Sequence, residues 1–405
     1  MSTHLSKSTA QAGQLDPTFG VEGVVVPPLS ASAVRSMAMW ENEQVICVLW
    51  TAPSFSLVQY DVNGNIDNSF GLNGVAEGSF ANAPISSLPA LILLQKKERK
   101  ILVIGGAQSD VGNGHLAITR FNENGTPDLV FGRKVLPFPR EPAHQTPLAN
   151  GCLQEDGKIL LSYGYRLIEN GSTIQESGFI VRLTSDGVLD TDFGNGEGFV
   201  EVRFKDKDSV VSSIAVQSDG SIIAGGTMSS KYLILARFKP DGVLDTSFGV
   251  DGYAMLNIDK HVSENLLDFN VHEDKITCVG SVRTPGIEAF VTRFLQNGKI
   301  DQTFNNGVPL YHVLGVGGGW RTLAIQEDNK IVVAGSDVKT PSTLFWGRFN
   351  EDGTPDSVFT DHGATTGLVG NAWQLAVQSS KNRIVLAGES FEINRRVAQI
   401  YGIEK

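Results

Sequence analysis

The chain has 405 residues, of which 41% are hydrophobic and 19% are charged, a composition that supports a folded core and excludes wholesale disorder. Its net charge of -11 is spread along the sequence, and its basic cluster, residues 96–100, falls where a hairpin turn is expected, which argues against nucleic acid as a partner. The 44 glycines and the scarcity of helix-forming stretches predict many turns and short strands, and hence an all-β fold.

Residues 1–14 are polar and rich in Ser, Thr and Gln, and we expect them to form a flexible tail. They lack the apolar core of a signal peptide, and no apolar run in the sequence reaches membrane-spanning length. Cys47, Cys152 and Cys278 stand in apolar segments, which suits small buried side chains better than a disulfide framework. These features favour a soluble protein of the cytoplasm without a membrane span, with signal-independent export left open.

From residue 15 onwards a short motif recurs, consisting of an apolar residue or Pro, then Asp, two variable residues and Phe. The spacing between copies is regular, so we predict a single domain of seven repeats instead of the two or three domains that this length would ordinarily suggest. The motif copies define the units 15–65, 66–126, 127–188, 189–243, 244–299, 300–354 and 355–405.

Each unit contains four short apolar segments separated by turns, and the fourth unit shows this most clearly. Asp-Gly and Asn-Gly between apolar runs are strong hairpin signals because these residues tolerate positive φ. We therefore interpret one unit as a four-stranded antiparallel sheet. In the fourth unit the expected strands are residues 213–217, 221–226, 232–238 and 252–256.

Such sheets bury both faces when they stack radially around an axis, so the seven units predict a closed seven-bladed β-propeller. An open solenoid would need atypical capping repeats, which the sequence does not show. The last unit lacks a fourth strand, whereas residues 24–26 offer a strand ahead of the first unit. We expect this N-terminal strand to complete the last blade and to close the ring, which leaves no open sheet edge.

The fourth unit resembles the repeat of the delta-60 family of bacterial proteins, which carries the pattern AVQxDGKIIVAG … ARFNxDGxLDTSFG. Residues 324–335 match nearly as well, and the resemblance extends over residues 15–405. The first, third and fifth units depart from the pattern; Trp40, for example, stands at the position of Gln217. The family is similar in layout to propellers of the NHL type, and the resemblance implies architecture without a known activity or catalytic residue.

Two recurring residues invite a functional interpretation. The motif Asp could bind a metal or act as a base, but one Asp per turn more often accepts backbone N–H groups, and the motif Phe is expected in the core between blades. A recurring Arg could form a ring for an anionic ligand, although pairing with the turn carboxylate explains it better. The recurring Arg residues are Arg120, Arg182, Arg237, Arg293 and Arg348.

The sequence predicts no metal and no cofactor. The His residues show no ligand spacing, and neither a Cys-x-x-Cys pair nor a Gly-x-Ser-x-Gly nucleophile motif occurs. Carboxylates assembled from different blades would leave no signature in one sequence, so an enzyme is disfavoured and stays open as an alternative.

Positions at which the chain departs from its own repeat are the candidates for function, because the repeat does not require them. Two long loops, residues 107–115 and 165–178, are expected to project from one rim. A second candidate site lies just before the innermost strands, near the mouth of the axial channel, and could stack a sugar or hold a peptide. Alternatively, its Trp residues only plug the channel. This site consists of Trp320, Arg321, Trp373 and Arg35.

We therefore expect a non-enzymatic binding or scaffolding protein that engages a protein or peptide partner through one propeller face. One alternative is a carbohydrate-binding propeller with a glycan as partner, which exposure of Trp320 or Trp373 beside polar groups would favour. The other is a propeller enzyme of the hydrolase or lyase type, which carboxylates or His converging with a cation at the channel mouth would favour.

Overall fold

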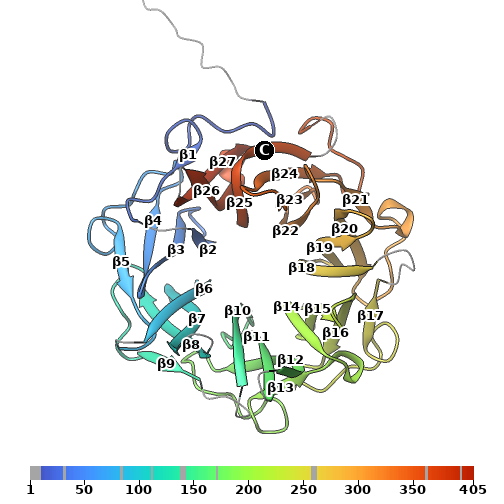
Figure 1. Cartoon of the computed structure of the whole chain (residues 1–405). Helices are drawn as coiled ribbons and strands as arrows, with labels where there is room; N and C mark the ends of the chain where they lie inside the picture. The colour runs from blue at the N-terminus through green and yellow to red at the C-terminus, as the bar shows by residue number, and fades with distance from the viewer. Residues whose placement is uncertain are drawn as a thin grey trace, which may run out of the picture.

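The computed structural model describes residues 11–30, 33–82, 85–110, 113–136, 143–169, 172–256, 262–360, 364–392 and 395–405. Within these ranges the regular structure is β-strand apart from three single-turn 3-10 helices, so the predicted all-β class is confirmed. The sheets are arranged around a central opening, and the strands of each sheet follow one another from the axis towards the outside (Figure 1). The 3-10 helices are η1 (Phe204–Asp206), η2 (Asn305–Gly307) and η3 (Ser379–Lys381).

Within the described residues, five sheets have four antiparallel strands each, in chain order from the inside to the outside. The first contains β2 (Val34–Met39), β3 (Val45–Thr51), β4 (Ser54–Tyr60) and β5 (Val75–Gly78). The second contains β6 (Ser86–Gln95), β7 (Lys100–Asp110), β8 (Asn113–Asn122) and β9 (Arg133–Val135). The third contains β10 (Ala143–Leu153), β11 (Ile159–Glu169), β12 (Ser172–Leu183) and β13 (Phe199–Val202). The fourth contains β14 (Ser209–Val216), β15 (Ile222–Met228), β16 (Tyr232–Phe238) and β17 (Tyr253–Met255). The fifth contains β18 (Ser263–His272), β19 (Lys275–Arg283), β20 (Ile287–Leu295) and β21 (Leu310–His312).

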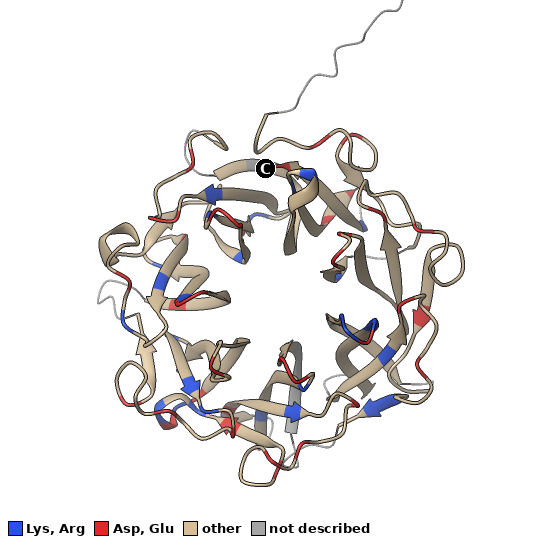
Figure 2. Cartoon of the chain, turned by 180° about the vertical axis from the view of Figure 1, so that it is seen from behind, with Lys and Arg blue, Asp and Glu red and all other residues tan. Residues whose placement is uncertain are grey.

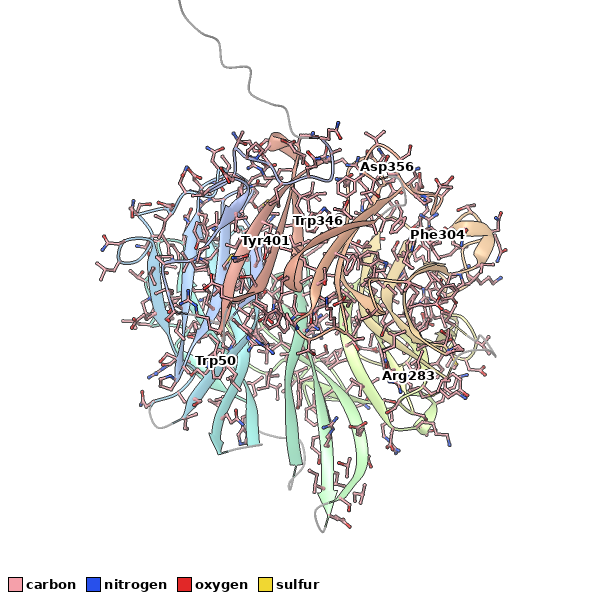
Figure 3. The ribbon with its side chains drawn as sticks, turned by 45° about the horizontal axis from the view of Figure 1, so that its top comes forward. Trp50, Arg283, Phe304, Trp346, Asp356 and Tyr401 are labelled. Atoms are coloured by element: carbon pink, nitrogen blue, oxygen red, sulfur yellow. The ribbon has the colours of Figure 1, made fainter. Side chains whose placement is uncertain are left out.

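The remaining described strands form one seven-stranded sheet, because the long strand β25 is shared. Its first part pairs with β24, up to Val369, and its second part pairs with β26, from Gly370 onwards. Trp346 of β24 and Tyr401 of β27 lie in one hydrophobic cluster of this region (Figure 3). The strand order is β1 (Val24–Val25), β27 (Arg395–Glu404), β26 (Arg383–Glu392), β25 (Ala364–Gln378), β24 (Thr343–Phe349), β23 (Ile331–Asp337) and β22 (Gly318–Ile325).

The N-terminal segment lies beside the last strand of the chain. Val24 pairs with Tyr401 in β27, and the backbone N–H groups of Gly13 and Glu404 donate to the carbonyl oxygens of Glu404 and Gln14. Of the predicted tail, residues 1–10 lie outside the described residues, whereas this pairing begins at Gly13, two residues before the predicted start of the domain.

The core is divided into hydrophobic clusters that lie between neighbouring sheets. Phe304, for example, packs with Val291 of β20 and Val333 of β23. Each cluster contains one motif Phe with at most 4% of its surface exposed, which confirms the predicted core role. Burial of a Phe side chain stabilises the fold by about 1.5–3 kcal/mol, so the motif contributes to every inter-sheet boundary. The motif Phe residues are Phe19, Phe70, Phe131, Phe193, Phe248, Phe304 and Phe359.

The two predicted loops are mostly strand. In the second, Tyr165 pairs with Ser177 and Arg166 with Glu176, so β11 and β12 continue as one hairpin up to residues 170–171, which lie outside the described residues. The ring of Tyr165 packs edge-on against Phe179 at 5.4 Å between ring centres. This apolar contact and the cross-strand pairs favour extended pairing over an irregular loop.

Candidate functional site

The motif Asp stabilises the turn in which it stands by accepting a backbone hydrogen bond. In Asp301, Oδ1 accepts the backbone N–H group of Thr303 at 2.9 Å. The other six motif Asp residues accept the N–H group two positions ahead in the same way, which confirms the predicted role in the turn. These residues are Asp16, Asp67, Asp128, Asp190, Asp245 and Asp356.

The second carboxylate oxygen, Oδ2, binds the recurring Arg, as predicted. In five units Nε of the Arg donates to Oδ2 at 2.7–2.9 Å, and the guanidinium lies 4.5–5.1 Å from the ring centre of the motif Phe. In the other two units Asp67 binds Gln59 at 2.9 Å and Asp16 binds Arg383 at 2.5 Å. The five regular pairs are Arg120–Asp128, Arg182–Asp190, Arg237–Asp245, Arg293–Asp301 and Arg348–Asp356.

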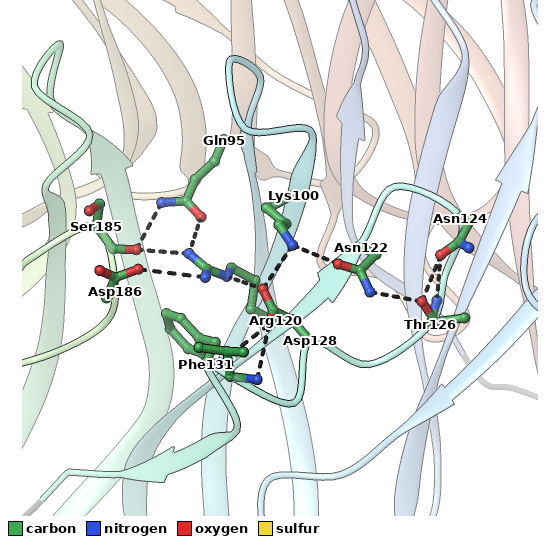
Figure 4. A network of polar contacts seen from close by, with 11 residues as sticks. Gln95, Lys100, Arg120, Asn122, Asn124, Thr126, Asp128, Phe131, Ser185 and Asp186 are labelled. Carbon is green, nitrogen blue, oxygen red and sulfur yellow. Dashed lines mark hydrogen bonds and ion pairs between the residues drawn. The ribbon is translucent and has the colours of Figure 1, made fainter.

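Figure 4 shows how one pair connects two units. Nη1 of Arg120 donates to the carbonyl oxygen of Ser185 in the next unit at 3.1 Å, and Lys100 binds Asp128 from the other side at 3.0 Å. Burial opposes ionisation of Asp128, but a hydrogen bond from Lys100, a backbone N–H group and the charge of Arg120 outweigh it and lower its pKa to about 2. Such a carboxylate is fully ionised and bonded, so it is poorly suited to proton transfer.

Arg383 replaces the usual Arg because of a steric constraint. In β27, Gly402 stands at the position that Arg348 occupies in β24. A Cβ atom at Gly402 would meet Phe19 at 2.6 Å, closer than atoms can approach. Arg383 therefore reaches Asp16 from the neighbouring strand β26, and both side chains are buried.

A cavity of about 810 Å³ lies on the axis. In the described part of the chain, its wall is formed by residues of the inner strands β2, β6, β10, β14, β18, β22 and β25, with a contribution from the long β11–β12 hairpin. Because every innermost strand contributes, the cavity collects side chains that stand far apart in the sequence.

β-Bulges direct single side chains into this cavity. In six of the innermost strands the register with the next strand shifts by one residue, and the extra residue lines the cavity wall. In β10 the corresponding irregularity spans Gln145 to Ala149, a stretch whose inner side chains lie outside the described residues. The six extra residues are Arg35, Ala90, Ser212, Leu267, Arg321 and Trp373.

Three of the four predicted site residues are thus brought together, and the fourth is not. Trp320 precedes the bulge, pairs with Gly335 and is fully buried between two sheets. The prediction that Trp320 stands at the channel mouth therefore needs correction, because the bulge directs Arg321 inwards and leaves Trp320 on the core side. Ala372, which is also buried, holds the corresponding place before Trp373.

Arg35, Trp373 and Arg321 form one contact group. The guanidinium carbon of Arg321 lies 4.2 Å from the ring centre of Trp373, and that of Arg35 lies 5.2 Å from Trp373 and 5.9 Å from Trp50. Neither guanidinium makes an ion pair or a hydrogen bond with the described residues. Burial is the main cause that lowers the pKa of both Arg residues.

Two acids, the buried Glu389 and the partly exposed Asp268, influence the charges of this group. Glu389 is 1% exposed and already accepts hydrogen bonds from Asn371 and Arg396. Asp268 in β18 accepts hydrogen bonds from the hydroxyl of Ser213 at 3.1 Å and from the N–H group of Phe269 at 2.9 Å. Burial is the main cause that raises the pKa of Asp268 to about 7, against the opposing hydrogen bonds and the charge of Arg321.

Sequence reasoning missed Trp50, Asp268 and Glu389. Asp268 occupies the register position that Ser213 has in the fourth unit, and Glu389 that of Thr227, so both depart from the repeat and carried a detectable signal. Among the described residues, no three His, Cys, Asp or Glu side chains gather as a metal site would require. The described part of the chain also contains no helix long and apolar enough to span a membrane.

A model for a β-propeller domain of unknown function, DUF5122, matches residues 99–131, 154–193, 217–248 and 326–359. Each matched segment ends at a motif Phe. The comparison with curated proteins gave no match.

Several solved structures are similar to this chain. Virginiamycin B lyase from Staphylococcus aureus, crystallised with quinupristin, has a TM-score of 0.54 and 10% identity over 93% of this chain and 98% of that one. YCF48 bound to D1 peptide has a TM-score of 0.51 and 11% identity over 99% and 100%. Extracellular domains 1–2 of Drosophila Semaphorin 1b have a TM-score of 0.54 and 8% identity over 97% and 88%. At such low identities the likeness shows a common β-propeller fold alone.

Proposed function

We propose that the chain is a binding protein of the delta-60 repeat type, folded as a closed seven-bladed propeller, and that its axial face engages a peptide or a peptide segment of a protein. The seven-stranded sheet then counts as two blades that meet within β25, at Val369 and Gly370. In the same scheme β1 is the outer strand of the last blade.

The observation that carries this proposal is the contrast between the repeated residues and the axial wall. The Arg and Asp residues of the motif are paired with each other, whereas Arg35, Arg321 and Trp373 leave the repeat pattern and meet in one cavity. Aromatic and Arg side chains of this kind supply much of the binding energy at protein interfaces. A cavity of about 810 Å³ has room for a few residues of a peptide.

Carbohydrate binding is the second candidate, since Trp373 is partly exposed in the cavity. A sugar binds an aromatic ring by stacking on its face, however, and Arg321 and Arg35 already lie over Trp373. A hydrolase or lyase is the third candidate, for which Asp268 is the acid with a pKa near neutrality, although no metal-binding cluster accompanies it among the described residues.

Selection of a displayed random-peptide library on the purified chain, with a glycan array in parallel, tests the proposal. The selected peptides should bind wild type and lose binding to Trp373→Ala. The matched control is Leu129→Ala, a substitution at an exposed position outside the cavity, which should leave binding unchanged. Glycan binding without peptide binding would favour the second candidate, and peptides that ignore Trp373→Ala would contradict an axial site.

A further inference from the structure

The most unusual charges in the molecule are the two Arg residues of the axial cavity. The protein has a net charge of -11, and its Asp and Glu residues are spread over the turns around the ring (Figure 2). Despite this excess of acids, Arg35 and Arg321 form no ion pair with the described residues. They act on each other with like charge, which further lowers the pKa of Arg321.

Leaving these groups unpaired is energetically unfavourable. Each guanidinium carries five N–H donors, and both side chains are only partly exposed, so their charges are solvated less well than in bulk water. The nearby acids offset this cost only in part: the charge of Glu389 raises the pKa of both Arg residues, but Glu389 is already bonded to Asn371 and Arg396 and forms no ion pair with either guanidinium. Asp268 likewise forms no ion pair with them, and its Oδ1 is already bonded to Ser213.

Trp373 holds the guanidinium groups of Arg35 and Arg321 and so limits which ligand groups they can bind. The guanidinium carbons of Arg321 and Arg35 lie 4.2 and 5.2 Å from its ring centre, so cation–π attraction holds both cations at one place in the cavity while their N–H groups have no acceptor among the described residues. Such N–H groups can bind the paired oxygens of a carboxylate with two parallel hydrogen bonds. The contact group is thus preorganised for an anion and not for the face of a sugar.

The other residues of the cavity wall indicate what kind of group the ligand carries next to its anionic group. The bulge positions Ala90 and Leu267 are small or apolar, and Leu88 and Leu91 also line the cavity. These residues stand on β6, which neighbours β2 and its Arg35, and on β18, which neighbours β22 and its Arg321, so an apolar side chain next to the anionic group would be received by the wall beside the two Arg residues. The end of a peptide combines these two features, with a terminal carboxylate and a side chain on the same residue.

We propose that Arg35 and Arg321 bind the C-terminal carboxylate of a peptide whose last residue is apolar. This inference rests on the proposed peptide-binding function and assigns the chemistry of its ligand. It differs from binding of an internal Asp or Glu or of free phosphate, which offer similar oxygens.

The first experiment uses N-acetyl-leucine and N-acetyl-leucinamide as probes, with binding measured by calorimetry on the full chain. We expect the carboxylate to bind at least about tenfold more tightly than the amide, since a charged hydrogen-bonded pair is worth 1.4 kcal/mol or more. Equal affinity of the two probes, or no binding of either, would overturn the proposal. Inorganic phosphate that binds as tightly as N-acetyl-leucine would also overturn it, in favour of a general anion site.

The second experiment separates the sources of the carboxylate with peptides selected from the library. Each peptide is compared as the free acid, as the C-terminal amide, and as the amide with an internal Glu. We expect only the free acid to retain full affinity, and Arg35→Met and Arg321→Met each to reduce it at least tenfold. The matched control is Arg166→Met, because Arg166 also lines the cavity but is paired with Glu176.

Melting temperatures of all variants show whether the fold is retained. Peptides that bind through Trp373 with equal affinity as acid and amide would contradict the carboxylate assignment and leave the proposed function standing. A chain that binds N-acetyl-leucine but selects no peptide would instead contradict the proposed function alone.

Discussion

The motif Arg residues and the axial Arg residues have opposite surroundings. Arg293, near the outside of the ring, is 4% exposed and is bound by Asp301, by a backbone carbonyl of the next unit and by the ring of Phe304. Arg321, on the axis, is partly exposed and lies over the ring of Trp373 without an ion pair, where the cation Arg35 lowers its pKa and the acids Glu389 and Asp268 raise it. The first arrangement recurs around the ring, whereas among the described residues of the axial cavity the second is limited to Arg35 and Arg321.

We infer from this difference that the motif Arg residues stabilise the fold, whereas the axial Arg residues are available to bind a ligand. A charge that is buried in every unit needs a partner within the protein, because otherwise its desolvation cost would be repeated around the ring. Charges that stand at only two bulges, as Arg35 and Arg321 do, can remain without an ion pair because the desolvation cost is not repeated in every unit. Substitutions at both places test this difference.

The largest expected effect is at Arg293. Arg293→Met leaves the buried carboxylate of Asp301 without its cation, so the free energy of unfolding should fall by about 3–5 kcal/mol. Urea denaturation followed by circular dichroism measures this change. Arg166→Met, which removes a partly exposed pair, is the control and should change it by less than about 1 kcal/mol. A loss at Arg293 no larger than that of the control would contradict the structural role.

The next effect concerns Asp268 and depends on pH. Its folded-state pKa of about 7 lies above the unfolded value of about 3.9, so its protonation stabilises the fold, and this stabilisation is lost as pH rises towards 7. Asp268→Asn should therefore make the chain more stable at pH 8, by up to about 4 kcal/mol, with little difference near pH 4. Urea denaturation across this pH range checks it. A constant difference at every pH would show that Asp268 does not titrate there.

Arg321 should behave in the opposite way to Arg293. Arg321→Met removes a partly buried charge without an ion-pair partner, and the thioether chain keeps the contact with Trp373, so stability should stay within about 1 kcal/mol of wild type or rise. The measurement is the same urea denaturation as for Arg293→Met. A loss as large as that at Arg293 would mean that Arg321 has a structural partner in solution.

The smallest effect is expected at Lys100, the second cation on Asp128. Lys100 is partly exposed, and Arg120 holds the carboxylate without it. Lys100→Met should cost only about 0.5–1 kcal/mol, a difference that high salt reduces further. Thermal denaturation at two salt concentrations measures it, and a loss of several kcal/mol would show that Arg120 alone does not satisfy Asp128.

The sequence predicts the repeated parts of this molecule well for physical reasons. The motif Asp, the motif Phe and the Asp-Gly turns act through local geometry and recur, so each unit supports the interpretation of the others. A β-bulge has no recognisable sequence motif. Its one extra residue moves the following side chains to the other face of the strand, so the face on which each side chain lies is unknown until the register is known. For this reason Trp320 and Arg321 could not be assigned to core and cavity before the register was known. Asp268 and Glu389 were detectable only as departures from the repeat.

The presence of Gly402 together with Arg383 in the last unit also bears on how the repeats can be exchanged. A copy of the fourth unit grafted in place of the last one would bring an Arg to the position of Gly402, against the ring of Phe19, and would remove the cation that holds Asp16. The last unit and the N-terminal segment must therefore change together. Recombination among the repeats, in evolution or in the laboratory, is free within the ring only where this matched pair is kept intact.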